Sequence, residues 1–252
     1  MSEPLKEGAT FWDHLDELRS CIIRALIVTV VMAVLAFAFK ETLFSVVLAP
    51  SHNDFITYRL IGVPAFDIKL MNTGLTEQLM IHMRIALYTG LLLASPYVIY
   101  QLFGFVAPAL YDNEKRHAVK IVGSAYLMFI IGTAVNYFII FPLTVRFLGT
   151  YQVDPSVSNM LTIQSYADTL VSMSLVMGVV FELPVVSWLL AAMGIIKGEH
   201  MAKYRKHAFV AILIVAAIIT PTTDALTLFV VALPIWCLYE VSIGIVRLTR
   251  KS

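Results

Sequence analysis

Residues 170–196, LVSMSLVMGVVFELPVVSWLLAAMGII, form an apolar run whose single ionisable residue, Glu182, lies near its centre. At about 1.5 Å of rise per residue, this run exceeds the roughly 20 residues that cross a bilayer core. We therefore predict a tilted transmembrane helix. A charge at this depth costs roughly 3 kcal/mol on insertion scales and usually faces a bundle interior or a wet cavity. The pattern predicts that Glu182 is an intramembrane polar site; the alternative is a residue that only fixes helix packing.

Small and polar residues accompany Glu182 on one face of this predicted helix. Ser174 and Gly178 precede it at intervals of four residues, so that the three side chains share a face. Pro184 removes a backbone donor just beyond Glu182. The sequence therefore predicts a narrow polar stripe at a weakened point of the helix.

The composition is typical of an integral membrane protein. Of the 252 residues, 59% are hydrophobic and 14% are charged, against about 25% charged in soluble domains. A net charge of +1 without a block of arginine and lysine argues against a nucleic-acid partner. The six histidines are dispersed and no enzyme motif is present, so we expect no metal, no cofactor and no catalytic activity.

Apolar runs predict an all-α membrane protein, one domain over residues 1–252, with six transmembrane helices. The predicted spans are 22–39, 85–107, 121–141, 170–196, 208–219 and 225–246. The fifth has only 12 residues, about 18 Å of helix, so we expect a short last hairpin in a locally thinned bilayer. Periodicity that begins near Leu75 predicts a helix of about 30 residues, and Pro142 is expected to end the third span.

The segment before the first span has helical periodicity of its own. Thr10 and Asp13 resemble a capping box, and apolar residues recur at helical spacing, at Phe11, Leu15, Leu18 and Ile22. We predict a short amphipathic helix that lies on the membrane surface.

Six spans would place both termini and the loops after spans two and four on one side. That side would hold 13 of the 18 bases: Lys6, Arg19, Arg24, Lys115, Arg116, Lys120, Lys197, Lys203, Arg205, Lys206, Arg247, Arg250 and Lys251. The positive-inside rule therefore predicts that both termini are cytoplasmic. Glu17 and Glu114 are acidic points on this side and suit a basic peptide, because arginine binds carboxylates in a bidentate manner. The alternative is that both are solvated or partner a helix dipole.

Two segments resemble signatures of the TatC family, the core subunit of the twin-arginine protein translocase. They are HLDELR at residues 14–19 and FVAPALYDNE at residues 105–114. The similarity continues through FELP at 181–184 and LPIWCLYE at 233–240, and covers the chain from Phe11 to Val246. Two departures are Ser20 and Cys21, where the family usually has further bases, and the turn Thr220-Pro221-Thr222-Thr223-Asp224, where it usually has Thr-Pro-Pro-Asp.

The resemblance implies a receptor in the bacterial inner (plasma) membrane that binds twin-arginine signal peptides of folded proteins at its cytoplasmic face. It also implies an oligomeric complex with single-span subunits of the TatA and TatB type. Glu17 and Glu114 would contact the arginines, and Arg19 would order the surface helix. The residues implied to shape that site are Phe105, Pro108 and Leu110. The residues implied elsewhere are Glu182 on a concave surface, Pro50 in an outer cap, and Pro221 and Asp224 in the last turn.

Two other classes of function remain open at this point. One is an ion- or proton-coupled secondary transporter that uses Glu182 as a relay. The other is a passive assembly scaffold that binds partner helices and no signal peptide.

Overall fold

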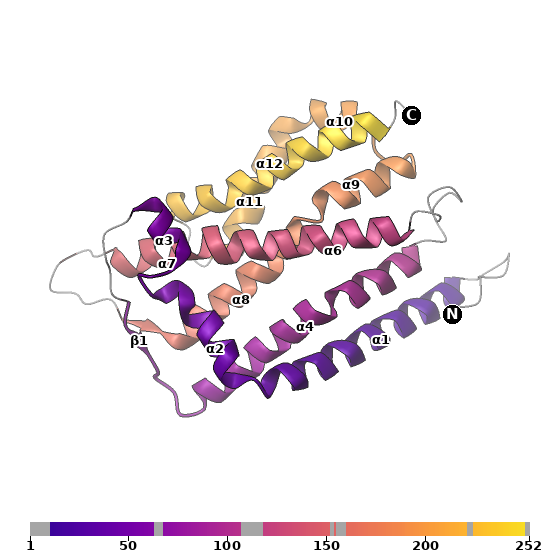
Figure 1. The fold of residues 1–252 in the computed structure, drawn as a ribbon. Helices are drawn as coiled ribbons and strands as arrows, with labels where there is room; N and C mark the ends of the chain where they lie inside the picture. The colour runs from indigo at the N-terminus through magenta and orange to yellow at the C-terminus, as the bar shows by residue number, and fades with distance from the viewer. Residues whose placement is uncertain are drawn as a thin grey trace.

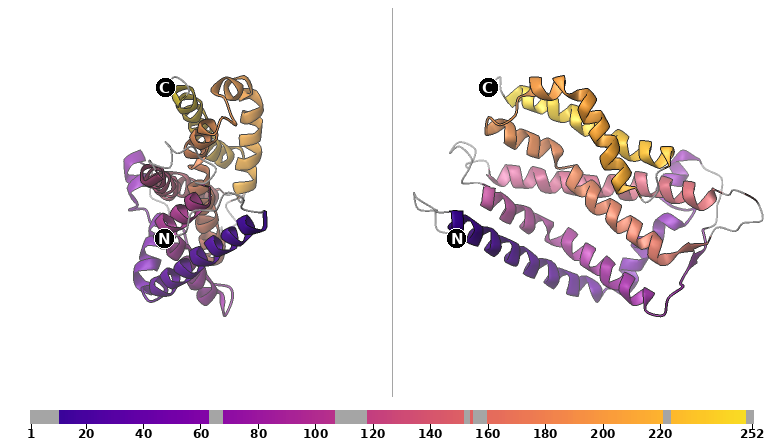
Figure 2. Two further views of the ribbon diagram at one scale, coloured as in Figure 1. Left: turned by 90° about the vertical axis from the view of Figure 1, so that its right-hand side faces the viewer. Right: turned by 180° about the vertical axis from the view of Figure 1, so that it is seen from behind.

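The computed structural model describes residues 11–62, 68–106, 118–151, 154, 160–220 and 224–249 of the chain. These residues are almost entirely helical, and the long helices form one bundle (Figure 1). The start of α1 and the end of α12 lie at one end of the bundle, which we name the terminal end. Helices α2, α3 and α7 lie at the opposite end, which we name the cap end (Figures 1 and 2).

The elements follow one another along the chain with two minimal strands among the helices. They are α1 (Phe11–Phe37), α2 (Lys40–Leu48), the 3-10 turn η1 (Ala49–Ser51), α3 (Ile56–Ile61), β1 (Leu70–Met71), α4 (Glu77–Val106), α6 (Ala118–Val135), the π-helical turn η3 (Asn136–Ile140), α7 (Phe141–Thr150), β2 (Leu161–Thr162), α8 (Ile163–Val180), α9 (Leu183–Ala192), α10 (Gly198–Lys203), α11 (Arg205–Ile219) and α12 (Ala225–Thr249).

Helix α1 is one continuous helix of 27 residues. The predicted division into a surface helix and a span that begins at residue 22 is not observed. The stretch contains no glycine or proline that would interrupt a helix, and a continuous helix satisfies its backbone groups internally in a membrane. The amphipathic segment therefore extends the span instead of turning along the surface.

Helix α4 has 30 residues and begins at Glu77, which confirms the long helix predicted from the periodicity near Leu75. It packs along α1, and the closest approach is at Gly90. A Cβ atom on Gly90 would lie 2.4 Å from the backbone nitrogen of Ala33. Only a glycine therefore allows the two backbones to approach this closely.

The third predicted span does not end at Pro142. After α6 the chain makes one π-helical turn at Asn136–Ile140 and continues as α7 to Thr150. Pro142 lies in the first turn of α7 but inside a continuous helical stretch, so the Phe138 carbonyl loses its helical N–H donor. The Thr57 hydroxyl of α3 donates a hydrogen bond to that carbonyl instead. The proline is thus accommodated by the irregular turn before it, and the helical stretch is longer than predicted.

The fourth predicted span is two helices instead of one. Helix α8 ends at Val180 and α9 begins at Leu183, with Pro184 in the first turn of α9. The weak point predicted beside Pro184 is therefore a two-residue interruption, at Phe181 and Glu182, within one helical stretch. Its physical cause is the backbone donor that proline lacks.

Five helical stretches of the described residues are long and apolar enough to cross a membrane. They are Leu15–Phe37, Glu77–Phe105, Ile121–Thr150, Ile163–Ala192 and Ala225–Leu248. Helix α11, predicted as the fifth of six spans, has only 15 residues, about 22 Å of helix. It is shorter than the five, so six spans are not confirmed. The α11–α12 hairpin is closed at the terminal end by an ion pair of 2.7 Å between Arg205 and Glu240.

The cap end is held together by hydroxyl groups that bond to backbone carbonyls. The Tyr58 hydroxyl lies 2.8 Å from the Pro50 carbonyl oxygen and 3.0 Å from that of Pro142. Burial raises the pKa of Tyr58, so the hydroxyl keeps its proton and donates it. Tyr166 donates to the Val47 carbonyl at 2.9 Å. Pro50 is therefore buried inside a cap that the bundle holds tightly.

A fully buried part of the core lies where α8, η3, α7 and α12 meet. Helices α8 and α12 both pack against η3, and the side chains fully buried there include Ile140, Phe141, Met173, Met177 and Val231. The apolar side chains on the outside of the bundle are the lipid-facing surface of a membrane protein.

Candidate functional site

The terminal end carries the described residues of the predicted arginine-binding site. Glu17 is half-buried and Arg19 is exposed, both on the first turns of α1, while Phe105 is half-buried on the last turn of α4. Glu114, Pro108 and Leu110 lie outside the described residues, as does Pro221. The structure therefore brings part of the predicted site to one end of the bundle.

Two cavities adjoin on one side of the bundle and form what we name the concave face. The first, about 380 Å³, lies between α4, α6, α8 and α9. The second, about 660 Å³, lies between α1, α4 and α8. Both are lined by Leu91, Val98, Leu102 and Leu175. Because they share these residues, the two cavities form one continuous and largely apolar surface.

The second cavity reaches the predicted arginine site. Cys21 and Leu102 line its end. Glu17 is one helical turn before Cys21, and Phe105 is one turn after Leu102, both toward the terminal end. These side chains therefore stand at the mouth of the concave face.

Glu182 lines the first cavity, at the break between α8 and α9. Its residue precedes α9, but its side chain makes no capping hydrogen bond. Within the part of the chain that the structure describes, Glu182 Oε1 is buried and has no hydrogen-bond partner. The carboxyl group thus faces a largely apolar cavity, and its buried Oε1 atom is an unsatisfied hydrogen-bond acceptor.

The other two members of the predicted polar stripe pack against η3 and α6. The Asn136 amide donates to the Ser174 hydroxyl at 2.8 Å. A Cβ atom on Gly178 would lie 2.6 Å from the ring of Phe129. Asn136 therefore bonds a neighbouring helix, and Ser174 and Gly178 serve helix packing. Glu182 alone of the three lines the first cavity.

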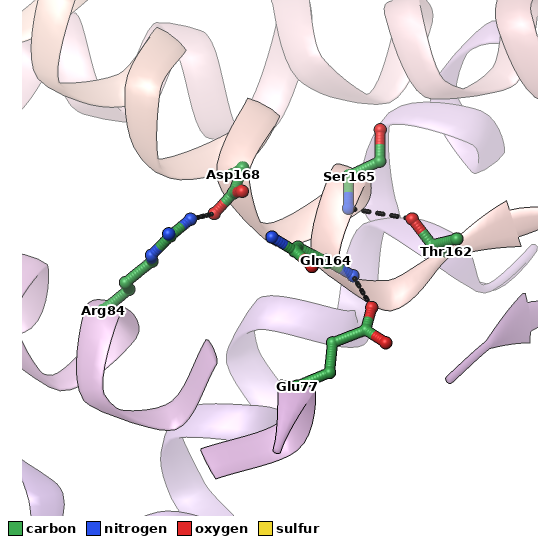
Figure 3. A network of polar contacts seen from close by, with 6 residues as sticks. All are labelled: Glu77, Arg84, Thr162, Gln164, Ser165 and Asp168. Carbon is green, nitrogen blue, oxygen red and sulfur yellow. Dashed lines mark hydrogen bonds and ion pairs between the residues drawn. The ribbon is translucent and has the colours of Figure 1, made fainter. Parts of the chain in front are cut away.

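Sequence reasoning missed a polar network at the cap end of α4 and α8 (Figure 3). Arg84 forms an ion pair with Asp168. Glu77 accepts hydrogen bonds from the backbone N–H groups of Thr73 (2.8 Å), Gly74 (2.7 Å) and Gln164 (3.2 Å), and from the Thr73 hydroxyl (3.1 Å). The available signal was one base and one acid directly before two predicted spans, at Arg84 and Asp168.

Asp224 caps α12, since its Oδ1 atom accepts from the Thr227 backbone N–H at 2.7 Å. Its side chain therefore acts as the helix cap of α12. Among the described residues, no group of three or more histidine, cysteine, aspartate or glutamate side chains could hold a metal ion.

A sequence profile of the family described as Sec-independent protein translocase protein (TatC) matches residues 13–234. The chain belongs to the TatC family. The TatC protein of Desulforapulum autotrophicum is 35% identical over 247 residues, which cover 98% of this chain and 87% of that protein. The TatC protein of Carboxydothermus hydrogenoformans is 32% identical over 243 residues, which cover 96% of this chain and 95% of that protein.

A solved TatC structure has the same fold. The crystal structure of a twin-arginine translocase receptor, TatC, matches with a TM-score of 0.79 and 31% identity, over 94% of this chain and 99% of that chain. The resemblance to TatC predicted from the signature segments is therefore confirmed. The chain is a component of the Sec-independent protein translocase and, with its long apolar helices, a multi-pass membrane protein. A proton-coupled transporter is not favoured, because these TatC matches cover nearly the whole chain.

Proposed function

We propose that this TatC-family chain is the receptor that binds twin-arginine signal peptides of folded proteins at the cytoplasmic face of the bacterial plasma membrane. Its two acidic side chains Glu17 and Glu114 hold the arginine pair, and the concave face receives the apolar part of the peptide. Both termini are cytoplasmic, and the chain crosses the membrane six times, with α11 as a short fifth span. The observation that carries the proposal is the place of Glu17 at the mouth of the concave face.

Electrostatics support an arginine pair as the ligand. A guanidinium group is planar, always charged and binds a carboxylate through two parallel hydrogen bonds. At a membrane surface, where water is partly excluded, such a pair is stronger than in bulk water. We assign the apolar surface of this site to Phe105, Pro108 and Leu110, the residues implied by the resemblance, and we assign to Arg19 the ordering of the first turns of α1. A lysine pair fits this site less well because it binds as two point charges.

Glu182 gives the concave face a second point of recognition. Its carboxyl group lies at the break between α8 and α9 and lines a largely apolar cavity. A donor on an inserted peptide or on a partner helix would satisfy it, since polar groups inside a membrane seek partners. We propose that this donor comes from single-span partner subunits of the TatA and TatB type in an oligomeric complex.

The test is photo-crosslinking of a signal peptide, labelled beside its arginine pair, to the chain in membranes. Glu17→Ala combined with Glu114→Ala should lower the yield by about tenfold or more, the factor expected when a hydrogen bond to a charged group is lost. Asp16→Ala is the matched control, because Asp16 is an exposed acid on the same helix turn. It should leave the yield unchanged.

A peptide whose arginines are replaced by lysines provides the second arm of the test. It should crosslink weakly to the unaltered chain and lose little more in the double variant. Equal crosslinking of the arginine peptide in the double variant and the unaltered chain would exclude the proposed contacts. A scaffold that binds only partner helices would retain those helices in a pull-down while crosslinking no peptide at all.

A further inference from the structure

The Arg84–Asp168 ion pair lies at the cap end of the second cavity and lines it. The two side chains come from α4 and α8 and point toward each other (Figure 3). They are 57% and 36% exposed. The second cavity therefore runs from Cys21 and Leu102 at the terminal end to a charged pair at the other, and we name it the trough.

The floor of the trough between its two ends is apolar. On α4 it is lined by Leu87, Leu91, Val98 and Leu102. From residue 87 to residue 102 the rise is about 22 Å, the length of a helix of about 15 residues. A bound helix of that length would cover the apolar floor and end at the ion pair.

The ion pair contributes little to holding α4 and α8 together. Exposed and half-exposed pairs contribute between about 0 and 1 kcal/mol to stability. Glu77, at the start of α4, already joins α4 to α8 because it accepts a hydrogen bond from the Gln164 backbone N–H. A structural role for Arg84 and Asp168 is therefore small, while their exposure within the trough is large.

A half-exposed ion pair favours one kind of occupant over another. An apolar segment pressed onto it would remove water from both charges without replacing their hydrogen bonds, which is costly. A polar segment would replace the water with hydrogen bonds from its own backbone and side chains. Because the pair offers both a donor and an acceptor, it suits a neutral polar segment better than a charged one.

We infer that the Arg84–Asp168 pair is a second subsite for the signal peptide and binds the polar segment that follows its apolar core. This inference rests on the proposed function, because Glu17 must hold the arginine end one helical turn from the start of the trough. With one end held at the mouth, an apolar core of about 15 residues places its polar continuation at the ion pair. The trough therefore selects signal peptides by the length of the apolar core.

The experiment places a photoreactive amino acid at Ser172 and uses signal peptides whose apolar cores have 11, 15 or 19 residues. Ser172 is exposed, lines the trough and is one turn from Asp168. With the core of 15 residues, whose polar continuation lies at the ion pair, the label should capture the last turn of the core. With the core of 11 residues it should capture the first polar residues after the core, and with the core of 19 residues a part of the core about two turns before its end. Ser124, exposed on α6 and outside both cavities, is the control position and should capture no peptide.

Variants of the pair separate this subsite from the arginine site. Arg84→Leu combined with Asp168→Leu should lower the Ser172 yield for the core of 15 residues by about tenfold, and should raise it for the core of 19 residues. The exchanged pair, Arg84→Asp with Asp168→Arg, keeps both charges and should keep the preference for a signal peptide with an apolar core of 15 residues. A capture pattern at Ser172 that ignores core length, or capture of lipid or a partner helix there, would overturn the subsite while crosslinking at Glu17 persists. Loss of crosslinking at both places would instead overturn the proposed function.

Discussion

Two glutamates on the α4–α8–α9 side of the bundle have opposite surroundings. Glu77 is 7% exposed and accepts four hydrogen bonds at the cap end, from Thr73, Gly74 and Gln164. Glu182 is buried to a lesser degree, and its Oε1 atom has no partner among the described residues. The Glu77 carboxylate joins a loop to the start of α8, and the Glu182 carboxyl group lines a cavity.

The difference shows how one residue type serves stability at one end of a membrane bundle and recognition at the other. Glu77 satisfies the backbone donors of a loop and of the start of α8, so its removal leaves three partly buried N–H groups without this acceptor. Glu182 satisfies no backbone group, because the break at Pro184 turns its side chain toward the concave face. The number of internal partners therefore indicates which acid is structural.

The largest expected effect comes from removing the saturated carboxylate. Glu77→Ala should lower the Tm of the purified chain more than any other substitution of a single described acid, because three backbone N–H groups lose their acceptor. Gln78→Ala, at the exposed neighbouring position, should leave the Tm nearly unchanged. Thermal unfolding of both variants in the same detergent makes the comparison. Equal Tm values for Glu77→Ala and Gln78→Ala would show that Glu77 is not the structural acid.

A smaller effect is expected where α6 supports the break that presents Glu182. A Cβ atom on Gly132 would lie 2.6 Å from the Met177 carbonyl oxygen and 2.7 Å from Phe181 Cβ. Gly132→Ala should therefore destabilise the chain by about 1–3 kcal/mol, the cost of overpacking a tight contact. Gly123→Ala, on the same helix with no atom within 4 Å of the new Cβ, should stabilise it by up to about 1 kcal/mol. If both variants unfold at the same denaturant concentration, α6 does not support the break.

The smallest effect on stability is expected at Glu182. Glu182→Gln keeps the shape of the side chain and removes an ionisable group from an apolar cavity, so the unfolding free energy should change by less than about 0.5 kcal/mol or rise. Transport of a twin-arginine substrate should nevertheless fall, because the cavity loses its acid. Assays of unfolding and of transport on the same membranes separate the two. A variant that unfolds as easily as Glu77→Ala would mean that Glu182 is structural.

The apolar runs predicted most helices because transmembrane segments must satisfy their own backbone hydrogen bonds, whatever their neighbours. The start of α4 near Leu75 and the weak point beside Pro184 followed from periodicity and from proline chemistry. The continuity of α1 and the extension of the third span past Pro142 did not follow. Both depend on packing that a single segment does not reveal, such as the π-helical turn at Asn136–Ile140.

The candidate site was predictable in its residue types and not in its geometry. The signature segments marked Glu17 and Glu114, and the apolar context marked Glu182, because a charge among apolar residues is visible in one dimension. The partnership of Arg84 with Asp168 was not visible, since 84 positions separate them and only the packing of α4 against α8 joins them.

The amino-acid sequence by itself determined that this chain is a helical membrane protein of the TatC family, because burial in lipid dictates long apolar helices and the signature segments are contiguous. The tertiary structure alone decided which polar side chains are consumed by packing and which face the concave surface. Ser174 and Gly178 share a helical face with Glu182, yet η3 and α6 cover the first two and leave the third to the cavity. That outcome depends on where a second helix lies, and no single segment carries this information.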